Sequence, residues 1–245
     1  MRILVTRAEP DASAQAETLL SLGHQVLISP MLEVEICPPA QFELSTAQAV
    51  IATSRNGLRA IENHRDLGRF STLPIYVVGP TTADYARKLG FQKVITGPAA
   101  APELVDIISQ QAEYRDDRHK FIYLAAKQPS FDMAGKLGAL GFSVDQQVVY
   151  HTKAASSFPA PILAAIKAGE IDSVILMSAR TAAIFADLLI SNGIQEQAST
   201  IMFLCFSKAV AEALRDLNPH MVEIAIRPRT EEVLALVHRM EEKSK

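Results

Sequence analysis

The feature that most constrains this chain is one local pattern that recurs along its whole length. A short apolar run rich in β-branched residues is followed by a few small or polar residues and then by an amphipathic helix. Strands that alternate with helices of about 10–15 residues form parallel sheets with helices on both faces. In the first half of the chain, the pattern predicts strands at 3–7, 25–28, 50–54 and 75–79.

The second half repeats the order of the first half. The apolar run at 121–124 corresponds to 3–7, and the runs at 174–178 and 203–207 correspond to 50–54 and 75–79. Two copies of a doubly wound α/β unit are therefore predicted, each with a parallel sheet.

Proline and serine residues mark two candidate linkers, which lie inside the repeats. A boundary between the repeats would fall near 109–120, a charged stretch without Pro or Gly that we interpret as a helix end and a surface loop. Linker-like composition lies instead near 36–40 and 150–161. If the chain crosses there, one domain spans 40–150, and the other combines 1–37 with 155–245. Each domain then takes its first unit from the opposite repeat, which is a swapped duplication.

The composition indicates a packed globular protein. Of the 245 residues, 49% are hydrophobic and 21% are charged, and the formal net charge of -3 gives no basic face for nucleic acid or an anionic membrane. The two cysteines lie far apart, and the first residues form no long apolar run. We therefore expect a reduced, cytoplasmic protein without a signal peptide or a membrane span.

Several kinds of chemistry lack their sequence motifs here. No GxGxxG, GxxxxGK[ST] or GxSxG string occurs, which disfavours dinucleotide, P-loop nucleotide and hydrolase chemistry. The six histidines form no HxxxH pair and no spacing typical of a metal site. We expect the protein to use no cofactor and no metal.

Polar residues follow the predicted strands at the places where ligands bind in doubly wound sheets. Each group precedes a helix, whose N-terminal amides attract anions by about 0.3–1 kcal/mol per helix. Several such ends could bind a polyanion despite the negative net charge, because the bulk field is screened beyond about 8 Å. An ordinary N-cap remains the alternative for any single Ser or Thr. The strand-end groups are Thr6-Arg7, Thr53-Ser54, Gly79-Pro80-Thr81-Thr82, Ala125-Ala126-Lys127, Ser178 and Ser207-Lys208.

The order of the motifs along the chain resembles the uroporphyrinogen-III synthase family over almost the full length. The resemblance rests on 3–7, Thr53-Ser54-Arg55-Asn56-Gly57, the run from Val77 to Phe91, the run from Leu137 to Tyr150 and the turn at Ser178. It implies two flavodoxin-like domains joined by two strands, with the active site in the cleft between the domains.

The same resemblance implies an activity and a substrate. The enzyme would be a hydro-lyase that closes hydroxymethylbilane, a linear tetrapyrrole with an acetate and a propionate on each ring, into uroporphyrinogen III with ring D inverted. No cofactor would be needed. We further expect a monomer, with at most a transient contact with hydroxymethylbilane synthase.

The site residues are implied by matching this sequence to the family's motifs. Tyr150 matches the active-site tyrosine and would assist catalysis. Ser207 and Val210 stand where the family tends to have Gly and Thr, and Lys208 is a hypothetical substitute for the lost contacts. The residues expected to bind substrate are Arg7, Ser54, Asn56, Gly79, Thr82, Ser178 and Ser207.

Two other functions fit parts of the pattern. A non-catalytic two-lobed α/β module that binds a small anionic metabolite would show the same repeats and strand-end hydroxyls, without a need for Tyr150. A nucleotide-sugar transferase with two Rossmann-like lobes is a further alternative, but such chains are usually longer, and no acidic pair typical of them is evident.

Overall fold

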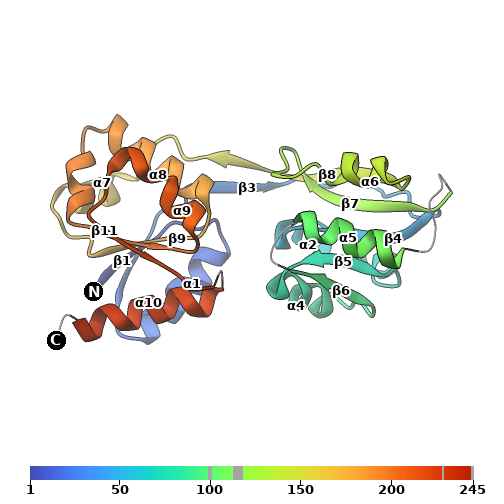
Figure 1. Ribbon diagram of the computed structural model, residues 1–245, viewed down its shortest axis with the longest axis horizontal. Coiled ribbons are helices and arrows are strands. Elements are labelled where there is room, and N and C mark those ends of the chain that lie inside the picture. Colours follow the sequence, from blue (N-terminus) through green and yellow to red (C-terminus); the bar gives the residue numbers. More distant parts are fainter. Residues whose placement is uncertain (99–100, 113–117, 228, 244–245) are drawn as a thin grey trace. The chain divides into compact units, whose positions relative to one another are not determined.

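The computed structural model describes residues 1–98, 101–112, 118–227 and 229–243 of the chain. The chain divides into two compact units, each with its own sheet. Unit 1 consists of Met1–Glu33 and Lys153–Lys245, and unit 2 consists of Val34–Thr152. Both ends of the chain therefore belong to unit 1 (Figure 1).

The sheet of unit 1 has five strands in the order β11-β10-β9-β1-β2, and every neighbouring pair is parallel. Counted along the chain within this unit, the order is 5-4-3-1-2, which is the flavodoxin-like order. The strands are β1 (Arg2–Val5), β2 (Gln25–Ile28), β9 (Ser173–Leu176), β10 (Met202–Cys205) and β11 (Met221–Ile224).

Helices cover both faces of this sheet, because its strands are apolar on both sides. Leu4 packs in one core with Phe185, whereas Ile3 and Val5 pack in a second core with Leu236. Alternate residues of a strand point to opposite faces, so one strand supplies both cores. Helices α7 (Ala160–Lys167), α8 (Ala179–Ser191) and α9 (Lys208–Glu212) border the first core, and α1 (Asp11–Ser21) and α10 (Thr230–Lys243) border the second. Two short 3₁₀ helices, η1 (Gln195–Ser199) and η2 (Arg215–Leu217), complete the described elements of this unit.

The sheet of unit 2 has the order β3-β8-β7-β4-β5-β6. The five strands from β8 to β6 are parallel neighbours. They follow the flavodoxin-like order when β7 and β8, which come last along the chain in this unit, are counted as its first and second strands. The strands are β3 (Leu32–Ile36), β4 (Ala47–Ala52), β5 (Ile75–Val78), β6 (Val94–Gly97), β7 (Lys120–Ala126) and β8 (Ser143–Ala154).

Two cores also enclose the sheet of unit 2. Val50 and Ala52 face a core that includes Leu58 and Phe70, while Ile51 faces a core with Leu137. Helices α2 (Arg55–Glu62), α3 (Leu67–Phe70) and α4 (Pro80–Lys88) border the first core, and α5 (Ala101–Gln111) and α6 (Met133–Ala139) border the second.

The strand orders confirm the predicted fold class of two doubly wound α/β units with exchanged segments. Strands β1 and β2 from the first half of the chain pair in one sheet with β9, β10 and β11 from the second half. Conversely, β7 and β8 from the second half extend the sheet of β4, β5 and β6. Each sheet thus combines the first two strands of one repeat with the last three strands of the other.

The chain passes between the units within two strands. The divisions fall at Glu33/Val34 in β3 and at Thr152/Lys153 in β8. The segment 150–161 is mostly regular structure, because β8 continues to Ala154 and Pro159 caps helix α7. In the charged stretch 109–120, α5 ends at Gln111 and β7 begins at Lys120, and 113–117 lie outside the described residues.

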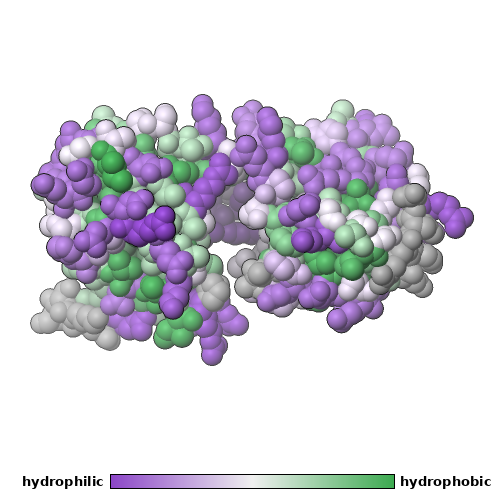
Figure 2. All heavy atoms as spheres, turned by 45° about the horizontal axis from the view of Figure 1, so that its top comes forward, coloured by the Kyte–Doolittle hydropathy of each residue, from purple (hydrophilic) through white to green (hydrophobic). Residues whose placement is uncertain are grey.

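The large hydrophobic side chains on the surface come from separate elements. Ile226, Leu20 and Ile190 are the most exposed of them, and they belong to a loop, to α1 and to α8. On the face drawn in Figure 2, hydrophobic residues lie among hydrophilic ones in both units. No helix of the described chain combines the length and the apolar character needed to cross a membrane.

Candidate active site

Each sheet reverses its strand order at one place, and the carboxyl ends of the strands at that place form the candidate site of the unit. In unit 1 the reversal lies between β1 and β9, and in unit 2 between β7 and β4. Ligands of doubly wound sheets bind outside the strand ends at such switch points. Arg7 and Ser178 follow β1 and β9, and Ser54 and Lys127 follow β4 and β7.

Ser54 is the N-cap of α2 in unit 2. Its backbone is extended, with φ -150° and ψ 150°, and its Oγ accepts a hydrogen bond from Asn56 N at 3.2 Å. The Asn56 side chain accepts from Arg59 Nη1 at 2.7 Å. Ser54 therefore has the capping role that any Ser before a helix can have, and Asn56 presents its side chain to Arg59.

Tyr150 lies on β8 beside this helix start and interacts with Ser54. Only 8% of Tyr150 is exposed, and burial raises the pKa of its hydroxyl above the ordinary value, with a smaller increase from Tyr123. A hydrogen bond with Ser54 lowers the pKa of Tyr150 and so opposes the effect of burial. A hydroxyl that donates to the phenolic oxygen has this effect, because it stabilises the ionised form. With Ser54 as the donor, the Tyr150 proton remains for another acceptor, and the hydroxyl stays protonated at neutral pH.

A second pair of hydroxyls lies next to Tyr150. Thr53 Oγ1 is 3.2 Å from Tyr123 Oη, and burial raises the pKa of Tyr123. Sequence reasoning did not single out Tyr123, because it lies inside an apolar strand and looks like a core residue there. The exposed Lys127 follows at the end of the same strand, and its N–H donates to Tyr150 O at 2.9 Å.

The turn after β5 depends on Gly79. This residue caps α4 with φ 76° and ψ 158°, a conformation that residues with a Cβ rarely adopt. Pro80 then occupies the first turn of the helix, where a missing N–H costs nothing. Thr82 is buried, with 5% exposed. The main chain of this turn is therefore better placed for an anion than the Thr82 side chain.

In unit 1, Ser178 is the N-cap of α8 in the same way as Ser54 is for α2. Its Oγ accepts from Thr181 N at 3.1 Å and lies 2.8 Å from Thr181 Oγ1. The buried Thr6 donates its hydroxyl to Ile175 O at 2.7 Å, which links the ends of β1 and β9. The two caps thus occupy equivalent positions in the two units, directly beside the strand reversal.

Arg7 and Ser207 complete the predicted set in unit 1. Arg7 Nη2 lies 3.0 Å from Asp11 Oδ2, so the guanidinium is partly neutralised by the first residue of α1. Ser207 is the N-cap of the short helix α9, but its side chain makes no capping hydrogen bond. Val210 is buried in the core and does not present a polar group, whereas Lys208 is exposed.

Four of the helices that follow inner strands, those after β4, β5, β9 and β10, share an electrostatic feature. The helices after the other two inner strands near the reversals differ, because α1 begins with Asp11 and Asp132 caps α6. Helices α2, α4, α8 and α9, all fully described, have no acidic residue in the first turn. An acidic residue there normally stabilises a helix by about 0.3–1 kcal/mol, and cations are disfavoured. Yet α2 and α8 carry Arg55 and Arg180 in the first turn. By contrast α5 and α10, which follow the outer strands, begin with Glu103 and with Glu231 and Glu232.

These N-termini are therefore suited to an external anion. The feature could have been found in the sequence, because it needs only the helix starts and the positions of Asp and Glu. None of the predicted contacts with a substrate is tested by the geometry, so the roles of the seven predicted binding residues and of Tyr150 stay predictions.

Two further features of the described residues bear on ligand binding. Within the described residues, no group of three or more His, Cys, Asp or Glu side chains is arranged to hold a metal ion. An open cavity of about 330 Å³ lies at the amino ends of the strands of unit 1, where Arg2 pairs with Glu170 and the main-chain N of Arg2 donates to Asp172. Its charged groups are thus already paired with one another, at the edge opposite the switch point.

The fold and the site define a class: two-domain α/β proteins in which exchanged segments complete two flavodoxin-like sheets with anion-suited strand ends. The family model described as uroporphyrinogen-III synthase HemD matches residues 13–235 of the chain. The chain belongs to this family.

Solved structures agree with this fold. The uroporphyrinogen-III synthetase of Helicobacter pylori 26695 matches with a TM-score of 0.65 and 19% identity, covering 98% of this chain and 100% of the other. A mutant uroporphyrinogen III synthase from the extremely thermophilic bacterium Thermus thermophilus matches with a TM-score of 0.59 and 17% identity, covering 99% of each chain. Comparison with curated proteins gave no match.

Proposed function

We propose that this protein is a uroporphyrinogen-III synthase, which converts hydroxymethylbilane into uroporphyrinogen III with loss of one water and inversion of ring D. Membership of the family supports the reaction. We infer an anionic substrate from the lack of acidic residues at the starts of α2, α4, α8 and α9. A substrate with an acetate and a propionate on every ring supplies the negative charge that these helices omit.

The binding role follows from the two equivalent sets of strand ends. The amides behind Ser54 and Gly79 in unit 2, and those behind Ser178 and Ser207 in unit 1, would each bind a carboxylate. Arg7 would contribute a charge-assisted hydrogen bond, in competition with Asp11. Asn56 would contribute mainly through its N–H, because its side chain is engaged by Arg59. Thr82, being buried, would act through its main chain.

The main catalytic task in this proposal is conformational. Loss of the substrate's hydroxyl as water leaves an electrophilic azafulvene at ring A, and the free end of the chain can attack it to give the symmetric type I ring. The type III ring requires attack by the substituted carbon of ring D, which forms a spiro intermediate that reopens and closes inverted. The enzyme must favour the crowded attack by orientation and by differential binding of its transition state.

Tyr150 would assist the departure of water. Its raised pKa keeps the hydroxyl protonated at neutral pH, and in this proposal Ser54 donates its hydrogen bond to the phenolic oxygen. The remaining proton can be donated to the leaving hydroxyl. A modest hydrogen-bond contribution is sufficient, because the electron-rich pyrrole expels water readily.

The direct test is the isomer ratio of the product. Hydroxymethylbilane is generated in situ with and without the protein, the porphyrinogens are oxidised, and type I and type III porphyrins are separated. We expect type III to dominate when the protein is present. An unchanged ratio, together with saturable binding of the bilane, would instead identify a non-catalytic anion-binding module and overturn the proposed function.

A further inference from the structure

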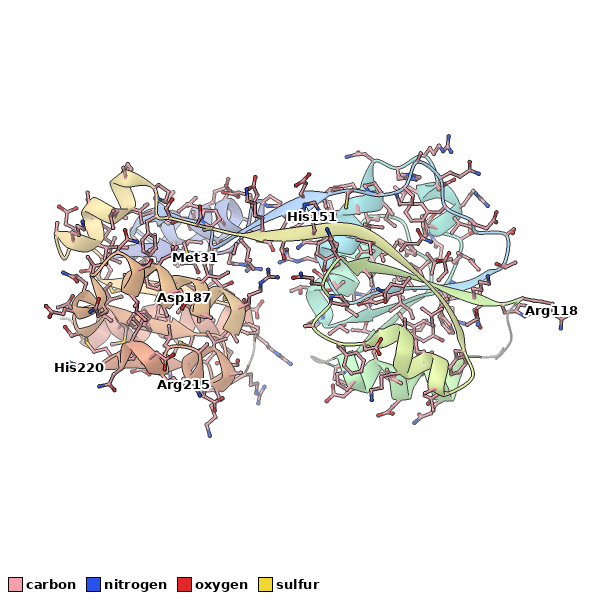
Figure 3. The ribbon with its side chains drawn as sticks, turned by 90° about the horizontal axis from the view of Figure 1, so that it is seen from above. Met31, Arg118, His151, Asp187, Arg215 and His220 are labelled. Carbon is pink, nitrogen blue, oxygen red and sulfur yellow. The ribbon has the colours of Figure 1, made fainter. Side chains whose placement is uncertain are left out.

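Three side chains beside the connecting strands form an ordered series of nucleophile, base and carboxylate. Cys37 directly follows β3, Glu35 lies on β3, and His151 lies on β8 (Figure 3). Cys37 Sγ is 3.8 Å from His151 Nδ1, and His151 Nε2 is 2.9 Å from Glu35 Oε2. All three belong to unit 2.

The carboxylate decides which imidazole nitrogen can act as a base. An ionised carboxylate only accepts hydrogen bonds, so a neutral His151 must carry its proton on Nε2 and donate it to Glu35. The other nitrogen, Nδ1, is then unprotonated, and it is the one that faces the thiol. A base oriented by a third group beside a nucleophile is the arrangement that activates thiols.

The backbone holds this series in place. Cys37 N donates to Val149 O at 2.8 Å, two residues before His151 on β8. Glu35 and Cys37 are two residues apart along extended backbone, so their side chains point to the same face. Tyr150 packs in the core of unit 2, whereas the half-buried His151 contacts Cys37 and Glu35.

The two cysteines of the chain differ in exposure and in surroundings. Cys37 is exposed and has a base within reach. Cys205 is fully buried, and burial raises the pKa of its thiol to about 12. Since the thiolate is the reactive form, a reagent in solution should discriminate strongly between the two.

We propose that Cys37 is a reactive thiol and a site of mixed-disulfide formation with small disulfides, with His151 as its base and Glu35 as the residue that positions His151. The thiol proton passes to His151 Nδ1, and the sulfur attacks one sulfur of the disulfide. The S–S bond of the disulfide breaks, a Cys37 mixed disulfide forms, and the departing thiolate takes the proton back from the imidazolium. The small disulfide is the oxidant, so the step is balanced. This inference does not rest on the proposed function.

The first experiment locates the adduct. The intact protein is incubated with glutathione disulfide, and the modified residue is identified by mass spectrometry after proteolysis. We expect one glutathione per chain, on Cys37, removable by a thiol reductant and lost in Cys37→Ser. Modification of Cys205 instead, or no adduct on the folded protein, would overturn the proposal.

The second experiment separates a base from mere accessibility. Rates of alkylation by iodoacetamide are compared for the wild-type protein, His151→Gln and Glu35→Gln in a Cys205→Ser background. At pH 7 we expect His151→Gln to react at least about threefold more slowly, with a smaller decrease for Glu35→Gln. At pH 10, where a thiol ionises without help, the three rates should converge. Equal rates at pH 7, or the same ratio of rates at pH 10, would show that His151 is not the base.

Matched control variants are present in the chain. Glu33→Gln removes the same charge two residues earlier on β3, and His220→Gln removes an exposed histidine of unit 1. Both should alkylate like the wild-type protein. A decrease in Glu33→Gln equal to that in Glu35→Gln would reduce the effect to general surface charge and overturn the positioning role of Glu35.

Discussion

Thr53 Oγ1 lies 3.2 Å from Tyr123 Oη, so a hydrogen bond joins the end of β4 to the interior of β7 at the switch point of unit 2. Tyr123 also contributes to the raised pKa of Tyr150, whose hydroxyl interacts with Ser54. Two neighbouring residues after β4, Thr53 and Ser54, thus each engage one tyrosine hydroxyl. Of these two pairs, Ser54–Tyr150 is the one at the start of a helix, because Ser54 caps α2.

We expect Tyr150→Phe to slow formation of uroporphyrinogen III about fivefold or more, which corresponds to the loss of one hydrogen bond of about 1 kcal/mol in the transition state. The ring of phenylalanine fills the same space, so the midpoint of thermal unfolding should change little. The measurement is the initial rate of type III formation with hydroxymethylbilane generated in situ.

Tyr85→Phe is the matched control for this variant. The Tyr85 hydroxyl donates to Glu62 at 2.9 Å, on the surface of α4 and α2 and outside the switch point. It should leave the rate unchanged. Equal rates for the wild-type protein and Tyr150→Phe would remove the chemical role assigned to Tyr150.

Ser178 can be tested as a cap and as a binding residue by two different substitutions. Ser178→Ala removes the acceptor for Thr181 N and should lower the free energy of unfolding by about 1 kcal/mol. Ser178→Asp keeps an N-cap acceptor, so stability should be retained, but it places a negative charge where a carboxylate of the substrate would bind. We expect the aspartate variant to raise KM about three- to tenfold.

The added charge must act locally for this interpretation to hold. Gln195→Glu adds one negative charge to η1, which precedes β10 and so lies at the opposite edge of the sheet. It should leave KM unchanged. If Ser178→Asp binds the bilane as tightly as the wild-type protein, the start of α8 does not contact a substrate carboxylate.

Much of the fold was predictable because its central strands are apolar on both faces. The expected strands at 75–79 and 203–207 correspond closely to the inner strands β5 and β10, and the expected strand at 25–28 is the edge strand β2. The edge strands β6 and β11 were not predicted, since a polar residue, Thr96 or Glu223, interrupts each of these short apolar runs. Strand β3 was not predicted, because Glu33 and Glu35 interrupt its apolar residues and the expected linker near 36–40 begins at its last residue.

The candidate site was predictable only in part, for a related reason. Residues that follow a strand and precede a helix stand out in a sequence, and Ser54 and Ser178 lie where that rule places them. Tyr123 does not stand out, because its proximity to Thr53 arises from the pairing of β7 with β4, which are far apart in the sequence. The interaction of Ser54 with Tyr150 likewise requires the exchanged strands.

Asp66 gives unit 2 a pH-dependent contribution to stability. Its Oδ2 accepts a hydrogen bond from the buried Phe42 N at 3.1 Å, which holds the pKa of the carboxyl below its ordinary value against the opposing effect of burial; Arg69 and His64 lower the pKa further. A pKa that is lower in the folded state stabilises above the unfolded value, about 3.9, and this contribution is lost as pH falls through the folded value.

We expect Asp66→Ala to lower the free energy of unfolding by about 1–3 kcal/mol at pH 7, because the N–H of Phe42 loses its acceptor. Asp66→Asn can still accept this hydrogen bond and should cost less. The part of the acid sensitivity that comes from Asp66 should disappear in both variants. Urea unfolding at pH 7 and at pH 3 measures the loss of unfolding free energy and its dependence on pH. If the wild-type protein and both variants lose the same unfolding free energy between pH 7 and pH 3, Asp66 does not cause the acid sensitivity.

Gly57 allows α2 to approach β7 closely at the candidate site. A Cβ on this residue would lie 2.8 Å from Leu124 O, a backbone atom that cannot move without displacing the strand. We expect Gly57→Ala to lower the free energy of unfolding by about 1–3 kcal/mol, despite the better helix propensity of alanine. Displacement of α2 should also shift Ser54 away from Tyr150 and slow the reaction.

Gly138→Ala is the control, because a Cβ on this helical glycine meets nothing within 4 Å. That variant should unfold at the same or a slightly higher denaturant concentration. A Gly57→Ala protein as stable as Gly138→Ala would show that α2 can adjust at no cost, and the close approach to Leu124 would then place no constraint on the site.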